Sequence, residues 1–400
     1  MTIIARLGDL VEFYAGFGFP NQYQGSVEGE IPFAKVSDIS RALEDGGNAI
    51  YRAANYVSGE VAHKLRAKPF PTGTIVFAKI GEAIRKNRRA LTTREMLFDN
   101  NVMGVRPMNG KIDIDYLFRY LDTVDFYKLA NTTAVPSLRK SVLGELQIPL
   151  PPLDEQRRIA AILDKANQLR QKRRQAIALL DSLTQSIFLE MFGDPVSNPK
   201  GWPEIKLADC CASNDDIKCG PFGTQLYQTD FRTSGVPLWG IKQVNKAFRL
   251  PTREFVSKAK AKDLEIYDLL PGDLVMTRKG TVGNSAIYPA NFSPGIMHSD
   301  LLRVRLDPSA AAPGFMNAQL RYSGSIAHQL SLISGGAVMA GINVGKLKKI
   351  TVLLPALADQ RKFESVLGRW QTAWNNYEMN LSQQDLLFSS LQYRAFSGQL

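Results

Sequence analysis

The chain of 400 residues is poor in the side chains that most often bind metals or form disulfides, with three cysteines and three histidines. Cys210, Cys211 and Cys219 do not make a disulfide framework, which favours a reduced, cytoplasmic setting. The histidines lie far apart and show no zinc-binding spacing. We therefore expect neither a metal centre nor structural disulfides.

Long apolar runs are missing as well. The chain has no run of about eighteen apolar residues, the length that a membrane-spanning helix needs, and its apolar start is too short for a signal peptide. Its hydrophobic content of 44% is ordinary for a globular protein. A chain of this length usually forms two or three domains, and we expect them to be cytoplasmic.

Recognisable catalytic motifs are also absent. The stretch "GINVGK", which ends at Lys346, lacks the first glycine and the final Ser or Thr of a phosphate-binding loop. The stretch "GFGF" from Gly16 lacks the spacing and setting of a dinucleotide fingerprint. We find no Asn-Pro-Pro-aromatic motif of adenine methyltransferases, no Glu-x-Lys nuclease signature and no Gly-x-Ser-x-Gly elbow. The sequence thus predicts a chain without a catalytic site, cofactor or metal of its own.

What the chain does contain is an internal repeat. "LPPLDEQRRIAAILD" begins at Leu150 and "LPALADQRKFESVLG" begins at Leu354, an offset of 204 that continues without a gap to the end of the chain. Weaker similarities connect upstream segments, such as "PTGTIVFAKIGEAI" and "LPGDLVMTRKGTVGNSAI". The chain is therefore one unit of about two hundred residues present twice. We predict globular domains at 1–150 and 194–354, followed by helices at 151–193 and 355–400.

The repeated segments have the pattern of long helices. Apolar residues recur in steps of three and four, the seven-residue repeat of coiled coils. A helix capped by Asp154 and ending at Phe192 would be about 58 Å long, and its own domain could not bury so long an apolar stripe. We therefore expect the two helices to pack on each other, although two unrelated core helices are an alternative. The predicted contact positions include Leu169, Leu183 and Leu387.

The segments before the helices combine both kinds of secondary structure. "GTIVFAKI" and "GDLVMTRK" each place a turn glycine before a short apolar run, which is typical of a buried strand. From Gly110 the pattern predicts a strand edge followed by an amphipathic helix, and the segment from Ala312 is its counterpart. The fold class that we predict is α/β (α+β), with two similar globular domains.

Basic residues outnumber acidic ones by 49 to 38, and this net charge of +11 favours a polyanionic partner. Lys and Arg bind the phosphates of DNA, and Arg also forms hydrogen bonds with guanine edges. Asn and Gln form hydrogen bonds with adenine edges. An alternative is a set of solvated basic loops without a ligand, but the recurrence of the clusters at matching places favours DNA contact. The candidate DNA-binding residues are Lys79, Arg85, Lys86, Arg88, Arg89 and Arg94 in the first domain, and Lys242, Gln243, Asn245, Lys246, Arg278, Lys279, Thr281 and Asn284 in the second.

These segments resemble the specificity subunits of type I restriction–modification systems. The resemblance rests on "LDEQRRIAAILD" in the helical repeat, "KCGPFGTQL" from Lys218 and "PGDLVMTRKGTVG" from Pro271, and it covers essentially the whole chain. The first domain matches more loosely, with "YAGFGFPNQY" in place of "KCGPFGTQLY". The second helix begins with Ala358-Asp359 in place of Asp154-Glu155. These differences leave the target sequence open.

The resemblance implies an architecture and a set of partners. In this family two helices pack as an antiparallel coiled coil and separate two target recognition domains related by a pseudo-twofold axis. Each domain reads one half of a split site in double-stranded DNA, and helix length sets the gap. The subunit docks two adenine methyltransferase subunits, which bind S-adenosylmethionine. Motor-nuclease subunits, which use ATP and Mg²⁺, join for cleavage.

Two further points stay open in the sequence. The paired Gln156-Arg157 and Gln360-Arg361 either contact the methyltransferase partners or only cap and solvate the helix starts. The second candidate function is a non-catalytic scaffold that assembles protein partners without reading DNA, and an enzyme in its own right is the third.

Overall fold

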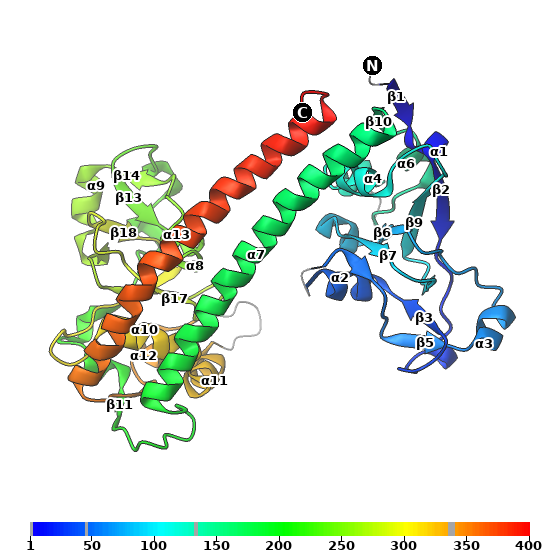
Figure 1. The fold of residues 1–400 in the computed structure, drawn as a ribbon. Coiled ribbons are helices and arrows are strands. Elements are labelled where there is room, and N and C mark those ends of the chain that lie inside the picture. Colours follow the sequence, from blue (N-terminus) through cyan, green and yellow to red (C-terminus); the bar gives the residue numbers. More distant parts are fainter. Residues whose placement is uncertain (1–2, 45–46, 132–134, 335–340) are drawn as a thin grey trace. The chain divides into compact units, whose positions relative to one another are not determined.

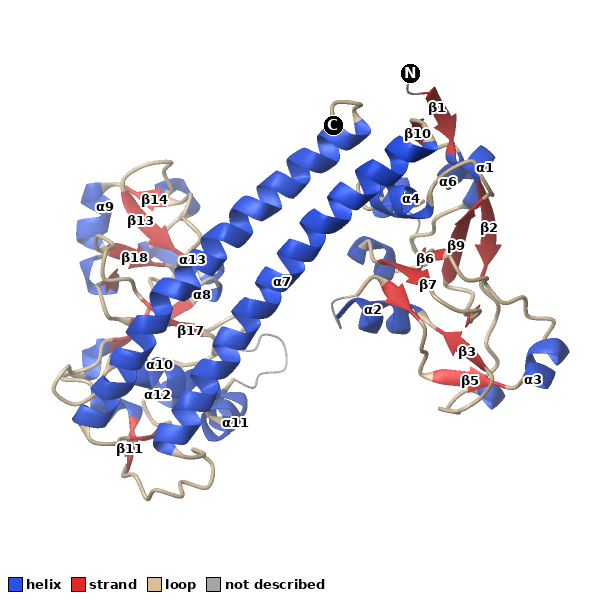
Figure 2. Ribbon diagram, viewed as in Figure 1, coloured by secondary structure: helices blue, strands red, loops and turns tan. Residues whose placement is uncertain are grey.

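The computed structural model describes residues 3–44, 47–131, 135–334 and 341–400, apart from the side chains at 371–373 and 375. The chain divides into two compact units. Unit 1 comprises Met1–Gln175 and Glu378–Leu400, and unit 2 comprises Ala176–Tyr377. Both units combine helices with small sheets, as predicted (Figures 1 and 2).

Unit 1 is built around a five-stranded sheet in the order β2-β9-β6-β7-β4, with a three-stranded sheet β5-β3-β8 and the pair β1-β10. The strands are β1 (Ile3–Arg6), β2 (Val11–Ala15), β3 (Ile31–Ala34), β4 (Ala49–Ile50), β5 (Asn55–Val57), β6 (Ile75–Ala78), β7 (Arg89–Thr92), β8 (Leu97–Phe98), β9 (Val102–Pro107) and β10 (Gln147–Leu150). The helices are α1 (Leu7–Leu10), α2 (Val36–Glu44), α3 (Gly59–Lys64), α4 (Ile114–Leu121), α5 (Phe126–Leu129) and α6 (Lys140–Gly144). Strands β7 and β9 pair with the two edges of β6. The apolar run of β6 is buried along its whole length, because its alternating side chains enter two different hydrophobic clusters.

Unit 2 has two four-stranded sheets, ordered β12-β19-β16-β17 and β14-β13-β18-β15, and the pair β11-β20. The strands are β11 (Glu204–Lys206), β12 (Ile217–Cys219), β13 (Val236–Trp239), β14 (Phe255–Val256), β15 (Asp268–Leu269), β16 (Leu274–Thr277), β17 (Ser285–Ile287), β18 (Gly295–Met297), β19 (Leu301–Val304) and β20 (Thr351–Leu353). The helices are α8 (Ile241–Asn245), α9 (Lys258–Asp263), α10 (Pro313–Tyr322), α11 (Gly324–Ile333) and α12 (Val344–Leu347). The strands expected around Pro71 and Leu270 and the helices expected after Gly110 and Ala312 are therefore confirmed as β6, β16, α4 and α10. The strand edge expected at Gly110 is wrong, because the chain forms a turn there before the N-cap residue Asp113 of α4.

The two repeated segments form the long helices α7 (Leu153–Phe192) and α13 (Leu357–Phe396) of 40 residues each, or about 60 Å. Helix α7 begins one residue earlier than predicted, so Asp154 lies in its first turn and is not the cap. Each helix contributes one part to each unit. In unit 1 the last turn of α13 completes the core, because the ring of Phe396 contacts those of Tyr116 and Tyr120 on α4.

In unit 1 the start of α7 runs antiparallel to the end of α13 (Figure 1). Arg170 donates to Asp385 at 2.6 Å and stacks on Phe388, and Arg158 donates to the carbonyl of Leu400. Three of the predicted contact positions were wrong, because Leu169, Leu183 and Leu387 are exposed. In unit 1 the neighbouring Arg170 and Phe388 make the contact in place of Leu169 and Leu387.

In unit 2 the end of α7 meets the start of α13 and α10 in an aromatic core. Phe188 and Phe192 pack against Phe363 of α13 and Phe315 of α10. Each long helix thus contributes residues near its two ends to the hydrophobic clusters of both units. Within the described ranges, no helix has the length and apolarity that crossing a membrane requires.

Candidate nucleic-acid interface

The turn between β16 and β17 carries four of the predicted DNA-binding residues on a rigid frame. Thr277 donates its backbone N–H to the carbonyl of Asn284, and its hydroxyl donates to the carbonyl of Thr281. Gly280 and Gly283 have φ angles of 68° and 85°, which favour glycine because a side chain there would be strained. The turn therefore holds Arg278, Lys279 and Thr281 in fixed places beyond the buried strand.

Helix α8 brings a second predicted segment to this turn. The amide of Asn284 donates to the side-chain oxygen of Asn245 at 2.8 Å, and the amide of Asn245 lies 3.4 Å from the hydroxyl of Thr281. Asn245 and Thr281 are exposed. The structure thus joins residues from two distant segments in one surface group of amides and a hydroxyl. Such groups offer both the donors and the acceptors that pairing with a base edge requires.

Arg278 lies beside this group and stacks on Phe222, from the loop after β12. The Arg278 Cζ atom is 5.0 Å from the centre of the Phe222 ring, and Phe222 is 50% exposed. Among the described residues, the buried Nε and Nη1 of Arg278 have no hydrogen-bond partner. Buried N–H groups without an acceptor are costly. The Phe222 ring therefore holds the guanidinium in place, and two of its nitrogen atoms lack a hydrogen-bond acceptor among the described residues.

The remaining predicted residues of unit 2 have different environments. Lys279 forms an ion pair with Asp300 at 3.2 Å, while Lys242 and Lys246 are exposed. The side-chain oxygen of Gln243 accepts the N–H of Gly240 at 3.2 Å and so caps its own short helix. The exposed amide group is therefore formed by Asn245 and Asn284 and does not include Gln243.

Unit 1 has a lysine at the place that Arg278 occupies in unit 2. The N–H of Lys79 donates to the carbonyl of Asn101 at 2.8 Å, as that of Arg278 does to Asp300 at 2.9 Å. The carbonyl of Lys79 accepts from Leu138, as that of Arg278 accepts from Ile342. Both residues directly follow the equivalent strands β6 and β16. The repeat thus presents a different cation at the same position of each domain.

The other basic residues predicted in unit 1 do not form one patch. Arg85 stacks on Tyr127 at 4.0 Å and donates to Glu82. Arg88 pairs with Glu44, and Arg94 donates to a backbone carbonyl at Glu30. Lys86 is exposed. A cluster that is continuous in sequence is therefore distributed over several parts of the domain.

Arg89 belongs to the interior of unit 1. Its side chain is 3% exposed, donates to the carbonyls of Asn87 and Val124 at 3.0 and 2.6 Å, and stacks on Phe126. Burial lowers the pKa of Arg89 to about 10. The prediction of a DNA contact for Arg89 is therefore wrong, because neighbouring groups of its own domain enclose it.

The two glutamines predicted to contact a partner are also buried. Gln156 is 1% and Gln360 0% exposed, and each carboxamide is hydrogen-bonded within its own unit. The prediction of partner contact is therefore wrong for both, and the alternative of a role at the helix starts fits them. Arg157 pairs with Asp154 and Arg361 donates to the carbonyl of Pro308, both at exposed positions. Partner contact stays a prediction for these arginines.

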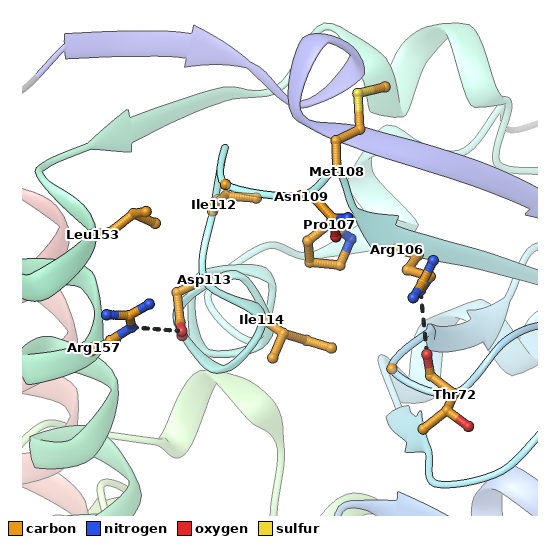
Figure 3. A pocket seen from close by; sticks show the side chains of 12 residues that line it. Thr72, Arg106, Pro107, Met108, Asn109, Ile112, Asp113, Ile114, Leu153 and Arg157 are labelled. Atoms are coloured by element: carbon orange, nitrogen blue, oxygen red, sulfur yellow. Dashed lines mark hydrogen bonds and ion pairs between the residues drawn. The ribbon is translucent and has the colours of Figure 1, made fainter.

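A cavity of about 260 Å³ lies beside the start of α7 in unit 1 (Figure 3). Arg157 and Asp113 face each other across 3.9 Å at its wall, and Arg106 donates to the carbonyl of Thr72. Asp113 also accepts the N–H groups of Asp115 and Tyr116 and so caps α4. The polar side chains that line this cavity therefore have partners in the fold around them, and we assign the cavity no ligand.

In the described part of the chain, no three His, Cys, Asp or Glu side chains are grouped so that they could hold a metal ion. Burial raises the pKa of both Cys210 and Cys211 to about 12, so neither thiol ionises near neutral pH.

Sequence reasoning missed Phe222 as a functional candidate. The residue lies within the quoted stretch "KCGPFGTQL". An aromatic residue between glycines in a predicted turn could have been proposed as a surface contact residue. Its contact with Arg278 depends on a loop 56 positions away in the chain, so the sequence pattern could not reveal it.

Comparison with known proteins gives a consistent result. Residues 4–179 match the model of the type I restriction modification DNA specificity domain. The specificity subunit of the type I restriction enzyme MjaIX of Methanocaldococcus jannaschii is 24% identical over 287 residues, 66% of this chain and 62% of that protein. The specificity subunit of the Escherichia coli enzyme EcoDI is 29% identical over 184 residues, 40% of each chain. The matches thus span less than two thirds of either relative.

The fold as a whole also has a solved counterpart. The S subunit of a type I restriction–modification system from M. genitalium matches with a TM-score of 0.58, covering 99% of this chain and 96% of that chain. The sequence identity is 14%, so this likeness concerns the fold alone.

Proposed function

Because the chain belongs to the specificity subunits of type I restriction–modification systems, we propose that it selects the DNA site on which such a complex acts. In this proposal the chain has no catalytic centre. Its two target recognition domains, residues 1–150 and 194–354, each read one half of a split duplex site, and α7 and α13 set the gap between the halves.

One observation carries the proposal. Asn245 of α8 and Thr281 and Asn284 of the β16–β17 turn form one polar group at the surface, next to the stacked guanidinium of Arg278. Amide pairs suit adenine edges, and arginine suits guanine edges and phosphates. Exposed lysines such as Lys242 and Lys246 supply non-specific attraction to the DNA backbone.

The proposal includes partners that supply the chemistry. Two adenine methyltransferase subunits dock on the chain, and each flips its target adenine out of the duplex and methylates it with S-adenosylmethionine. The exposed Arg157 and Arg361, at equivalent positions of the repeat, are candidates for this docking. Motor-nuclease subunits with ATP and Mg²⁺ complete the restriction complex, and all of these cofactors belong to the partners.

The test is selection of DNA from a random duplex library by the full chain in complex with its methyltransferase subunits. The proposal predicts an enriched pool with two short defined motifs separated by a gap of constant length. A pool without any motif, despite an assembled complex, would contradict it and favour the scaffold function.

A further inference from the structure

Each long helix has a buried glutamine as its fourth residue. Gln156 in α7 is 1% exposed and Gln360 in α13 is 0% exposed. A buried carboxamide is costly unless its donor and acceptor groups are paired. The partners of these two side chains therefore show what each glutamine holds together.

In unit 1, Gln156 bridges the helix start and the recognition domain. Its Oε1 accepts the N–H of Asp113 at 2.8 Å, and its Nε2 donates to the carbonyl of Pro151 at 2.8 Å. Asp113 is the N-cap residue of α4, and Pro151 directly follows strand β10. One side chain thus links the last strand of the domain, the long helix and the start of α4.

In unit 2, Gln360 makes the same two bonds. Its Oε1 accepts the N–H of Ala312, the N-cap residue of α10, at 2.9 Å, and its Nε2 donates to the carbonyl of Pro355 at 2.8 Å. The partners are backbone groups, which exist whatever side chains the domain has. Asp113 and Ala312 are chemically unrelated, yet both domains are held by the same bond pattern.

A second contact in each unit lies farther along the long helix. Arg119 of α4 donates to Asp164 of α7 at 2.5 Å, two turns beyond Gln156. In unit 2, Glu364 of α13 accepts the N–H of Gly314 of α10 at 2.5 Å, one turn beyond Gln360. Two separated contact points prevent rotation about either one. Each domain is therefore fixed on its helix in both position and angle.

We propose that Gln156 and Gln360 are positioning residues that make the recognised gap between the DNA half-sites constant. This inference rests on the proposed function. One added base pair moves a half-site by about 3.4 Å and turns it by roughly 35° around the duplex. A domain that is loose on its helix tolerates such a change, whereas a domain fixed by the glutamine does not.

The experiment repeats the random-library selection with the full chain in its complex, using Gln156→Leu, Gln360→Leu and the double variant. Gln175→Leu, at an exposed position of α7, is the matched control. Gln156→Glu separates the two bonds, because a carboxylate still accepts the N–H of Asp113 but cannot donate to the carbonyl of Pro151. Thermal unfolding of every variant checks the fold.

We expect the leucine variants to enrich the same two half-site motifs with a wider range of gaps. The preference for the native gap over one longer by a base pair should fall about tenfold, as the loss of buried hydrogen bonds predicts, and Gln175→Leu should match the wild type. A single constant gap in the double variant would overturn the inference. A joint loss of both motifs would also overturn it, because it would show that the glutamines support folding and not the constant gap. Failure of the wild type to enrich any motif would instead contradict the proposed function.

Discussion

Arg278 and Phe222 form a cation–π pair in unit 2, with 5.0 Å between the guanidinium carbon and the ring centre. The pair joins the two stretches of this domain that resemble recognition-domain motifs, "KCGPFGTQL" and "PGDLVMTRKGTVG". Stacking restricts the rotamers of a long side chain, so that less entropy is lost when the guanidinium binds an acceptor.

Replacement of Arg278 by alanine, alone and with Lys279→Ala, is expected to weaken DNA binding. Log affinity falls linearly with log salt, and each lost phosphate contact should make this slope less steep by about 0.9. Affinity measured at several salt concentrations checks this expectation. Arg321→Ala is the matched control, because Arg321 is not among the predicted DNA-binding residues and pairs with Asp181 of α7. A double variant with the wild-type slope would refute a phosphate contact at this turn.

Replacement of Arg89 by leucine is expected to act on stability instead. The guanidinium satisfies two backbone carbonyls in the interior of unit 1, and the loss of such a buried charged partner should lower the free energy of unfolding by about 3 kcal/mol. Urea unfolding of the full chain measures this loss. Arg85→Leu, which removes an exposed ion pair, should leave the free energy of unfolding close to that of the wild type, because solvent screens such pairs. Equal losses in the two variants would argue against a core role for Arg89.

Two glycines at equivalent places should not tolerate a side chain. A Cβ at Gly16 would collide with the carbonyl of Asp99, and one at Gly220 would collide with the carbonyl of His298. Gly16→Ala and Gly220→Ala should each lower the free energy of unfolding by at least about 2 kcal/mol. Gly18→Ala is the control, because among the described residues no atom lies within 4 Å of its added Cβ. Stability of Gly220→Ala equal to that of Gly18→Ala would contradict the close approach.

Shortening both long helices by about one turn is expected to shorten the recognised gap. One turn removes about 5.4 Å of helix, or one to two base pairs at 3.4 Å each. Selection from a random DNA library gives the new gap. A full-length chain in which the same residues are replaced by alanine should keep the native gap. An unchanged gap in the shortened chain would show that helix length does not set the distance between the two half-sites.

The repeat and the long helices could be predicted from sequence because their signals are local and periodic. An offset of 204 and a seven-residue apolar pattern are visible without any knowledge of distant contacts. The contact positions were less predictable. Arg170 takes an inward place because Asp385 and Phe388 of α13 offer it an ion pair and an aromatic face. That pairing depends on how two distant segments align.

Charge and polarity alone misled us at buried positions. Arg89 begins strand β7 and is enclosed by Val124 and Phe126, more than thirty positions away. Gln156 looks like a solvent-facing residue in a first helical turn, but the start of α4 covers it. In contrast, residue type alone selected Asn245 and Asn284, and the structure adds the hydrogen bond between them. Their contact with DNA stays a prediction.

The most direct test of the central claim is a map of methylated adenines across the host genome, with and without the gene for this chain. Our account predicts that deletion abolishes methylation at one split motif, two short defined halves around a constant gap, and that the intact gene restores it. Methylation of the same motifs in both strains, with the partner methyltransferase active, would contradict the claim that this chain selects the DNA site.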